Sequence, residues 1–194
     1  MNILEKNIMK PKRHSFKKRE EKEFDERVLE VARVSRVVKG GRRIRFRVTV
    51  AIGDHKGRVG VGCGKANEVP IAVQKAVTQA KKRVINVPII NGTIPYEIIA
   101  TYGAAKVLLK PASSGSSIVA GGAARNIIEL AGITDILAKI LGSKSLINNS
   151  IAVLNGLNSF KPEIVEKLKK FENKDSNKKI LKENINITEE KQEK

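Results

Sequence analysis

A strict two-residue alternation from Arg43 to Gly53 constrains the fold of this chain more than any other feature. Large apolar residues occupy the even positions, and arginines occupy the first three odd positions. Successive side chains of a strand point to opposite faces, whereas a helix would scatter both sets around its axis. The segment therefore predicts a strand with one face of Ile44, Phe46, Val48, Val50 and Ile52 and another of Arg43, Arg45, Arg47, Thr49 and Ala51.

Glycines divide the flanking sequence into further elements. Gly40 and Gly41 can supply the positive φ that tight hairpin turns need, so a hairpin is expected there. A later apolar stripe at helical spacing leaves Lys75, Gln79, Lys81, Lys82 and Arg83 largely on the other side. The first unit is predicted as a strand from Arg27 to Val38, a turn at 39–42, a strand from Arg43 to Gly53, a turn at 53–57, a strand from Arg58 to Gly64, and a helix capped by Asn67 that buries Val69, Val73, Val77, Ala80 and Val84.

A second α+β unit is expected after the first. Its predicted elements are strands in 96–101 and 104–111, a loop at 113–117, a helix from Ala123 to Ala131 that Gly132 ends, a strand from Thr134 to Leu141, and a helix from Ser145 to Phe160 with Ile147, Ile151, Leu154 and Leu157 along one stripe. The fold class is therefore α+β in two small domains. The expected divisions are a flexible basic arm at 1–23, a β-β-β-α domain at 24–90, an α+β domain at 91–160 and a charged tail at 161–194, with a short helix that Pro162 starts and then disorder.

The positive charge of the chain is concentrated in the first unit. The chain carries a net charge of +18, and residues 24–90 hold 15 basic and 5 acidic residues. One sign of charge concentrated in a folded segment predicts a polyanionic partner, most often nucleic acid. No apolar run approaches the roughly 20 residues that span a bilayer, residues 1–14 lack a signal-peptide core, and a lone cysteine suits a reducing compartment. We expect a soluble cytoplasmic protein with no membrane partner.

Residues for catalysis or metal binding are scarce. The two histidines are His14, in the arm, and His55, in a turn beside Asp54. Adjacent turn residues rarely face one another, so a solvated turn is a better interpretation of His55 than a general base. One cysteine and two distant histidines make no metal site of known spacing. We expect no catalytic residue, no metal and no cofactor.

Two glycine-rich stretches invite nucleotide-binding interpretations. GVGCGKA, residues 60–66, fits neither the dinucleotide fingerprint nor the phosphate-loop pattern. Two interpretations stay open: Lys65 before a helix N-terminus could hold a phosphate, and the glycines could allow close packing over the third strand. PASSGSSIVAGGAA, residues 111–124, loosely resembles the phosphate loop of small-molecule kinases such as galactokinase, but it lacks the second glycine and the catalytic carboxylates.

The arginine strand is the strongest functional signal. Neighbouring arginines on one face repel each other unless an anion lies opposite, and Glu30 and Asp54 are the only acidic residues of the three predicted strands and their turns. The alternative is a solvated face. With no Trp, 2 Tyr and 5 Phe, little material exists for base stacking, which favours phosphate-directed binding of folded RNA. The predicted RNA-binding residues are Arg33, Arg36, Lys39, Gly40, Gly41, Arg42, Arg43, Arg45, Arg47, Lys56, Arg58 and Lys65.

Several ordered segments resemble one known family. RVSRVVKGGRRIRF (33–46) and GDHKGRVGVGCGKANEVPIAVQKA (53–76) resemble the first domain of the small-subunit ribosomal protein S5 family of bacterial type. The segments at 91–98 (NGTIPYEI), 103–143 (GAAKVLLKPASSGSSIVAGGAARNIIELAGITDILAKILGS) and 148–157 (NNSIAVLNGL) resemble its second domain. The resemblance spans about residues 24–160, with the motifs at the right separations.

The resemblance implies a structural role in the small ribosomal subunit, in its assembly, in messenger entry and in decoding accuracy. It implies a first domain like a double-stranded-RNA-binding domain without its leading helix, and a second of the left-handed β-α-β type. The first would bind ribosomal RNA, and ribosomal proteins S4, S8 and S3 and messenger RNA near the entry path would be further partners. A free-standing double-stranded-RNA-binding protein is the alternative. The implied site residues are Val34, Ser35, Lys39 and Gly40 in the loop near the spectinomycin site, and Ser117 and Arg125 toward S4.

The chain departs from the family pattern at two places. Gly-Thr-Gly is common where this chain has Gly115, Ser116 and Ser117. If the last of these glycines adopts positive φ, then Ser117 must be strained or the loop must differ. An arginine frequent in the last helix of the family is Ile151 here. Both departures affect the expected contact with S4.

Overall fold

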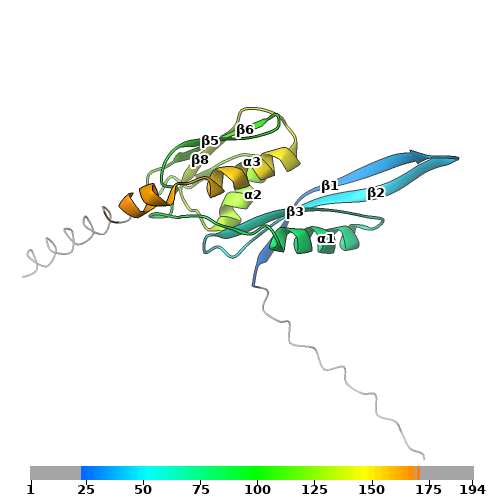
Figure 1. The fold of residues 1–194 in the computed structure, drawn as a ribbon, viewed down its shortest axis with the longest axis horizontal. Coiled ribbons are helices and arrows are strands. Elements are labelled where there is room, and N and C mark those ends of the chain that lie inside the picture. The colour runs from blue at the N-terminus through cyan, green and yellow to red at the C-terminus, as the bar shows by residue number, and fades with distance from the viewer. Residues whose placement is uncertain (1–22, 169, 171–194) are drawn as a thin grey trace, which may run out of the picture.

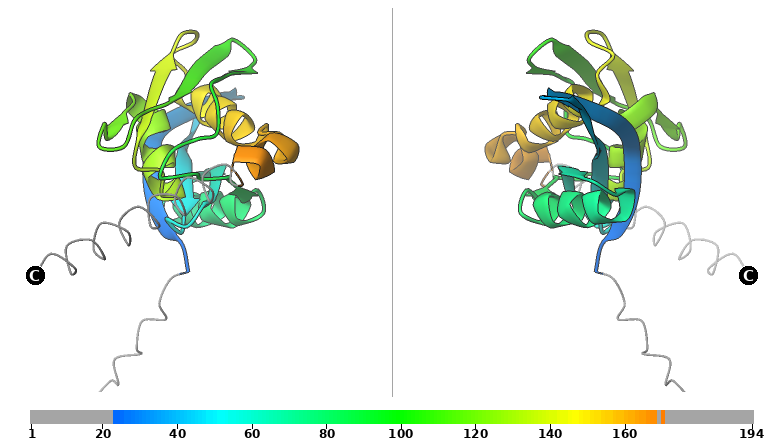
Figure 2. Two further views of the ribbon diagram at one scale, coloured as in Figure 1. Left: turned by 90° about the vertical axis from the view of Figure 1, so that its left-hand side faces the viewer. Right: turned by 90° about the vertical axis from the view of Figure 1, so that its right-hand side faces the viewer.

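The structure is a computed structural model that describes residues 23–168 and 170. Two α+β units form it, which confirms the predicted fold class. The second unit covers one side of the first sheet, a helix covers the other side, and a two-stranded hairpin extends away from both (Figures 1 and 2). The expected arm, except for Glu23, and most of the expected tail lie outside the described residues.

The first unit is an antiparallel sheet with one helix. Its strands are β1 (Asp25–Val38), β2 (Gly41–Gly53), β3 (Arg58–Ala66) and β4 (Ile85–Asn86), in that order across the sheet, and its helix is α1 (Val69–Lys81). The predicted cap Asn67 is wrong, because Glu68 is the residue with extended backbone that precedes the helix, and its side chain makes no capping hydrogen bond. Strand β4 was not predicted, because its two residues are too few to show an alternation.

Close packing of α1 on β3 explains the glycine alternation. A Cβ added at Gly62 would lie 2.1 Å from the backbone oxygen of Ala76, and one at Gly64 would lie 2.3 Å from that of Ala72. Both distances are far below van der Waals contact. The packing interpretation of residues 60–66 is therefore confirmed, and the apolar face of β2 completes this core with Val48, Val50 and Ile52.

The second unit is a mixed sheet with two helices. The strands are β5 (Ile98–Tyr102), β6 (Ala105–Pro111), β7 (Ile118–Val119) and β8 (Ile136–Ile140), in the order β5-β6-β8-β7, and the helices are α2 (Gly122–Ala131) and α3 (Leu146–Asn158). The expected β-α-β unit is β7–α2–β8, in which β7 and β8 are parallel neighbours. A further helical segment covers residues 162–168.

The predicted stripe on α3 is only half correct. Leu154 and Leu157 are buried, but Ile147 and Ile151 are only partly buried. The helix also buries polar and small residues on neighbouring positions, because it lies between the second sheet and the first unit. These additional buried residues are Asn149, Ser150, Ala152, Val153 and Gly156.

The two units share one core. The second half of the arginine side of β2 does not face solvent: Thr49 is 1% exposed and Ala51 is fully buried. Ala51, Val59 and Val61 lie in the same apolar cluster as the interior of the second unit. The segment between the units also contributes, since Val87, Ile90 and Ile94 are buried in this cluster. The division near residue 90 stays a prediction.

A direct backbone contact fixes the junction between the units. The turn between β2 and β3 lies against the C-terminal end of α2, where the backbone N–H groups of His55 and Gly57 donate to the carbonyls of Leu130 (3.0 Å) and Ala131 (2.9 Å). The last carbonyls of a helix have no partner within it, so the first unit caps this helix of the second. Gly132 ends α2 as predicted, with a left-handed φ of 86°.

Candidate nucleic-acid interface

The strand register shows which basic residues share a face of the hairpin. Residues directly opposite each other on paired strands point to the same side. Arg43 pairs with Arg36, Arg45 pairs with Val34, and Arg47 pairs with Ala32 on one neighbour and with Lys65 on the other. The surface that we call the arginine face therefore consists of Arg36, Arg43, Arg45, Arg47 and Lys65.

Two predicted residues point the other way. Arg33 pairs with Phe46 and Arg42 with Val37, so both side chains lie on the side of the sheet that α1 covers further along. Lys39 and Gly40 form the two-residue turn at the tip, with Gly40 at a left-handed φ of 86°, while Gly41 already belongs to β2. The hairpin tip thus carries positive charge on both of its faces.

The arginine face lacks neutralising partners. Within residues 23–168 and 170, Arg36, Arg43, Arg45 and Lys65 make no ion pair, and the buried Nε of Arg47 has no hydrogen-bond partner. Glu30 pairs with the buried Thr49. Between this pair and the hairpin tip, β1 and β2 carry no further acidic residue. A hollow beside this face is lined by Val34, Ser35, Arg36, Val38, Arg43, Arg45 and Lys65.

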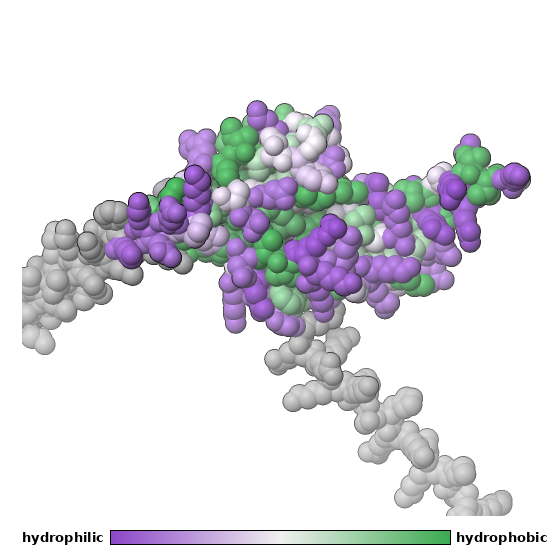
Figure 3. All heavy atoms as spheres, in the orientation of Figure 1, coloured by the Kyte–Doolittle hydropathy of each residue, from purple (hydrophilic) through white to green (hydrophobic). Residues whose placement is uncertain are grey.

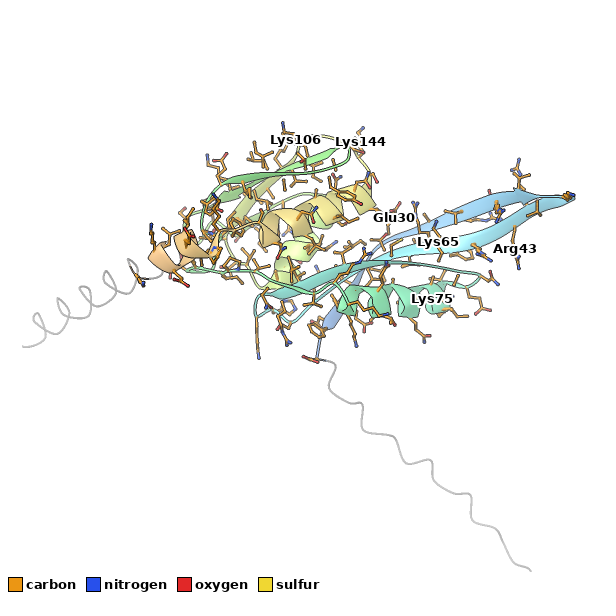
Figure 4. The ribbon with its side chains drawn as sticks, in the orientation of Figure 1. Glu30, Arg43, Lys65, Lys75, Lys106 and Lys144 are labelled. Atoms are coloured by element: carbon orange, nitrogen blue, oxygen red, sulfur yellow. The ribbon has the colours of Figure 1, made fainter. Side chains whose placement is uncertain are left out.

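Figures 3 and 4 show the β1–β2 hairpin, which carries this surface and extends away from the rest of the molecule. Arg43 and Lys65 lie along the strands, and Glu30 lies nearer the second unit (Figure 4). The hairpin is largely hydrophilic, with a hydrophobic patch near its end (Figure 3). Exposed basic side chains without ion pairs make a surface suited to an anionic partner.

Arg58 and Lys56 lie at the opposite end of the sheet. The Nε of Arg58 lies 2.7 Å from Oδ2 of Asp54, a second guanidinium nitrogen lies 3.0 Å from Glu23, and the group stacks over the ring of Phe24. Burial raises the pKa of Asp54, but the hydrogen bonds from Arg58 and the backbone outweigh it and hold that pKa below 3.8. Arg58 therefore takes part in an internal network, separate from the arginine face, whereas Lys56 is exposed.

Ser117 and Arg125 line one hollow at the edge of the junction. Ser117 has a left-handed φ of 59°, and its N–H donates to Oδ1 of Asp135 at 2.9 Å. This bond and one from Thr134 lower the pKa of Asp135 below 3.8. The strain expected at Ser117 is thus present, and the hydrogen bond to Asp135 holds it. The hollow is lined by Arg27, His55, Ser117, Ile118, Arg125, Glu129, Gly132, Ile133 and Thr134.

Charged groups at this hollow link the two units. Glu129 receives hydrogen bonds from both Arg27 and Arg125, and these bonds lower its pKa below 4.5. His55 was expected to be a solvated turn residue, but its Nε2 lies 3.1 Å from Asp25 and its Nδ1 lies 2.9 Å from the backbone oxygen of Glu129. No local pattern indicates such a role, because it depends on a contact between distant segments.

Other kinds of site find no support in the part of the chain that the structure describes. No group of three or more His, Cys, Asp or Glu residues could hold a metal ion there. None of the described helices is both long and apolar enough to cross a membrane.

Comparisons with known proteins agree with this geometry. Residues 24–88 match a family model described as "Ribosomal protein S5, N-terminal domain", and residues 100–167 match "Ribosomal protein S5, C-terminal domain". The chain is 50% identical over 148 residues to "Small ribosomal subunit protein uS5" of Thermotoga maritima, covering 76% of this chain and 83% of the relative. The protein of the same name from Thermotoga petrophila is 51% identical over the same shares.

Proposed function

The chain belongs to the ribosomal protein S5 family, of bacterial type, and from this premise we propose that it is a structural constituent of the small ribosomal subunit that binds folded ribosomal RNA through the arginine face. The observation that supports the RNA surface is the row of unpaired cations on the free half of the first sheet. Its place of action is then the ribosome in the cytoplasm. Family membership disfavours the alternative of a free-standing double-stranded-RNA-binding protein.

Electrostatics sets how this surface binds. Arginine presents a planar fork of donors that matches phosphate, and each neutralised phosphate releases counterions. Arg36 and Arg43 lie directly opposite each other on β1 and β2, where two like charges repel in the free protein. A bound phosphate between them relieves that repulsion. The face should therefore bind RNA by its backbone and shape, with strong salt dependence.

The hairpin tip is the part of this surface that reaches furthest. Lys39 and Gly40 form the turn, and Val34 and Ser35 lie on opposite faces of β1 behind it. We place this loop against the RNA near the spectinomycin site, where changes in the turn would alter how the drug and the RNA fit together. The two-sided charge of the tip, from Arg33 and Arg42 on one face and the arginine face on the other, supports insertion into folded RNA.

Neighbouring proteins are assigned to the second unit. The hollow with Ser117 and Arg125 is exposed and holds charged groups, and we propose that it faces ribosomal protein S4. Contacts with S8 and S3, and a place beside the messenger entry path, complete the proposal. The role in decoding accuracy would then depend on this hollow. We assign no catalytic step, metal or cofactor to the protein.

Loss of charge on the arginine face tests the RNA assignment. The change of Arg36, Arg43 and Arg45 to Ala should reduce the slope of log affinity for small-subunit RNA against log salt by roughly two to three units. The matched control changes Lys106, Lys139 and Lys144 to Ala, which are exposed lysines of the second unit without ion pairs among the described residues. An equal slope change in both variants would refute the assignment. Sucrose-gradient sedimentation of tagged chain tests the ribosomal role, since free protein with no small-subunit peak would contradict it.

A further inference from the structure

A second cationic surface lies on the other side of the first sheet, along the exposed side of α1. Lys75, Lys81, Lys82 and Arg83 are all exposed, and Figure 4 shows Lys75 on this helix, apart from Arg43 and Lys65 on the strands. A hollow on this helix is lined by Ile71, Gln74, Lys75, Thr78, Gln79 and Lys82. We call these four basic residues together with this hollow the α1 surface.

The only acidic residue next to α1 in the sequence is the exposed Glu68 at its start, and among the described residues no ion pair joins it to these charges. From Val69 to Tyr96 the sequence contains no Asp or Glu, and its basic residues are Lys75, Lys81, Lys82 and Arg83. None of the four makes an ion pair within the described part of the chain. In the second unit some basic side chains are paired, as Arg125 is with Glu129 and Lys110 with Glu97. Cations near a helix C-terminus stabilise the helix dipole, which accounts for Lys81 and Lys82 but not for Lys75 in mid-helix.

The α1 surface is held in a fixed position. Lys82 follows Lys75 by seven positions, which places their backbones roughly 10 Å apart along one side of the helix. Between them, the side chain of Gln79 accepts a hydrogen bond of 2.8 Å from the backbone N–H of Cys63 on β3. The glycines of β3 let the helix backbone approach the sheet closely. The basic side chains therefore project from a rigid support.

We propose that the α1 surface binds a second segment of RNA backbone, so that the first unit lies between two RNA segments. This proposal rests on the RNA-binding function proposed above. Lys75 and Lys82 contact phosphates, while the amide of Gln74 and the hydroxyl of Thr78 can hydrogen-bond ribose hydroxyls. The sheet and α1 separate the two surfaces, so one RNA segment binds the arginine face and the other binds the helix.

The chemistry of the α1 surface favours RNA over an acidic protein. Protein interfaces are enriched in aromatic residues and depleted in lysine, and a few buried anchors carry most of their binding energy. The α1 surface has one exposed large apolar residue, Ile71 at 43%, and no aromatic residue between Val69 and Lys82. Lysine and amide side chains on a helix instead match the regular charges of a nucleic-acid backbone.

A charge-matched comparison tests the proposal. In the full chain, Lys75→Ala with Lys82→Ala should reduce the salt slope for small-subunit RNA by roughly two units, and the reduction should add to that of the arginine-face variant. The control, Lys106→Ala with Lys139→Ala, removes the same charge from the second unit. Thermal unfolding should be almost unchanged in both, because all four side chains are exposed. A slope change no larger than that of the control would overturn the proposal, even where the arginine-face variant behaves as expected.

A bridging assay provides the second readout. Immobilised RNA fragments of the small subunit, saturated with the protein, should capture a second labelled fragment, and the Lys75/Lys82 variant should lose most of that capture while keeping its binding to the first. The arginine-face variant should lose capture as well. Equal capture by the wild type and the Lys75/Lys82 variant would refute a second RNA site on α1. If both variants fail to change any RNA binding, the proposed function itself fails.

Discussion

Replacement of Gly132 by alanine tests the junction between the two units. Gly132 has a left-handed φ of 86°, and a Cβ there would lie 2.2 Å from the backbone oxygen of His55. The left-handed conformation costs an alanine about 1–2 kcal/mol, and forced overpacking costs about 1–3 kcal/mol. We therefore expect the free energy of unfolding to fall by about 2–5 kcal/mol, out of about 5–15 kcal/mol for a typical protein.

Two other glycines separate the conformational cost from the cost of overpacking. Gly103 has a φ of 56° but no atom within 4 Å of an added Cβ, so Gly103→Ala should show only the conformational cost of about 1–2 kcal/mol. Gly41 has neither positive φ nor a close neighbour, so Gly41→Ala should be nearly neutral. Urea unfolding of the four proteins, followed by circular dichroism, measures the differences. If Gly132→Ala lowers the free energy of unfolding no more than Gly103→Ala does, the β2–β3 turn can move to make room for the added Cβ. That result would refute a rigid junction.

Three further changes address strain, pH and packing. Ser117→Gly should raise the free energy of unfolding by about 0.5–1 kcal/mol, because glycine removes the left-handed strain but adds chain entropy when unfolded; denaturant midpoints check this, and a loss of stability would contradict it. Asp135→Asn should destabilise the protein at pH 7, and the deficit should shrink as the pH falls below 3.8, because the lowered pKa of Asp135 stabilises the fold only while its carboxylate is charged; a deficit that stays constant from pH 7 to pH 2 would refute this. Gly62→Ala should destabilise by about 1–3 kcal/mol through its clash with α1, as thermal unfolding would show, and a neutral effect would mean that the helix can move away.

The strands were predictable because their signals are local. The alternation from Arg43 to Gly53 and the glycines at the hairpin turn depend only on neighbouring residues, and β2 spans that segment. The αL end of α2 at Gly132 is a similar local signal. The hairpin turn was predicted two residues too long, since Gly41 and Arg42 continue the strand to the tip.

The parts that could not be predicted depend on contacts between distant segments. Arg45 and Thr49 follow the same two-residue alternation of β2, so no local feature shows that Thr49 is buried by the second unit while Arg45 stays exposed. Arg33 falls on the side away from the arginine face because of its pairing with Phe46, which a β-bulge near Val28 helps to set. The involvement of His55 at the junction likewise depends on α2, more than 70 residues away in sequence.

The capping of α2 by the β2–β3 turn gives the molecule a fixed internal dimension. The backbone hydrogen bonds from the β2–β3 turn to the end of α2 join the sheet that carries the hairpin to the unit that carries the hollow around Ser117. Under the proposed function, the RNA at the hairpin and the neighbouring protein at the hollow would therefore bind at a spacing that the fold sets.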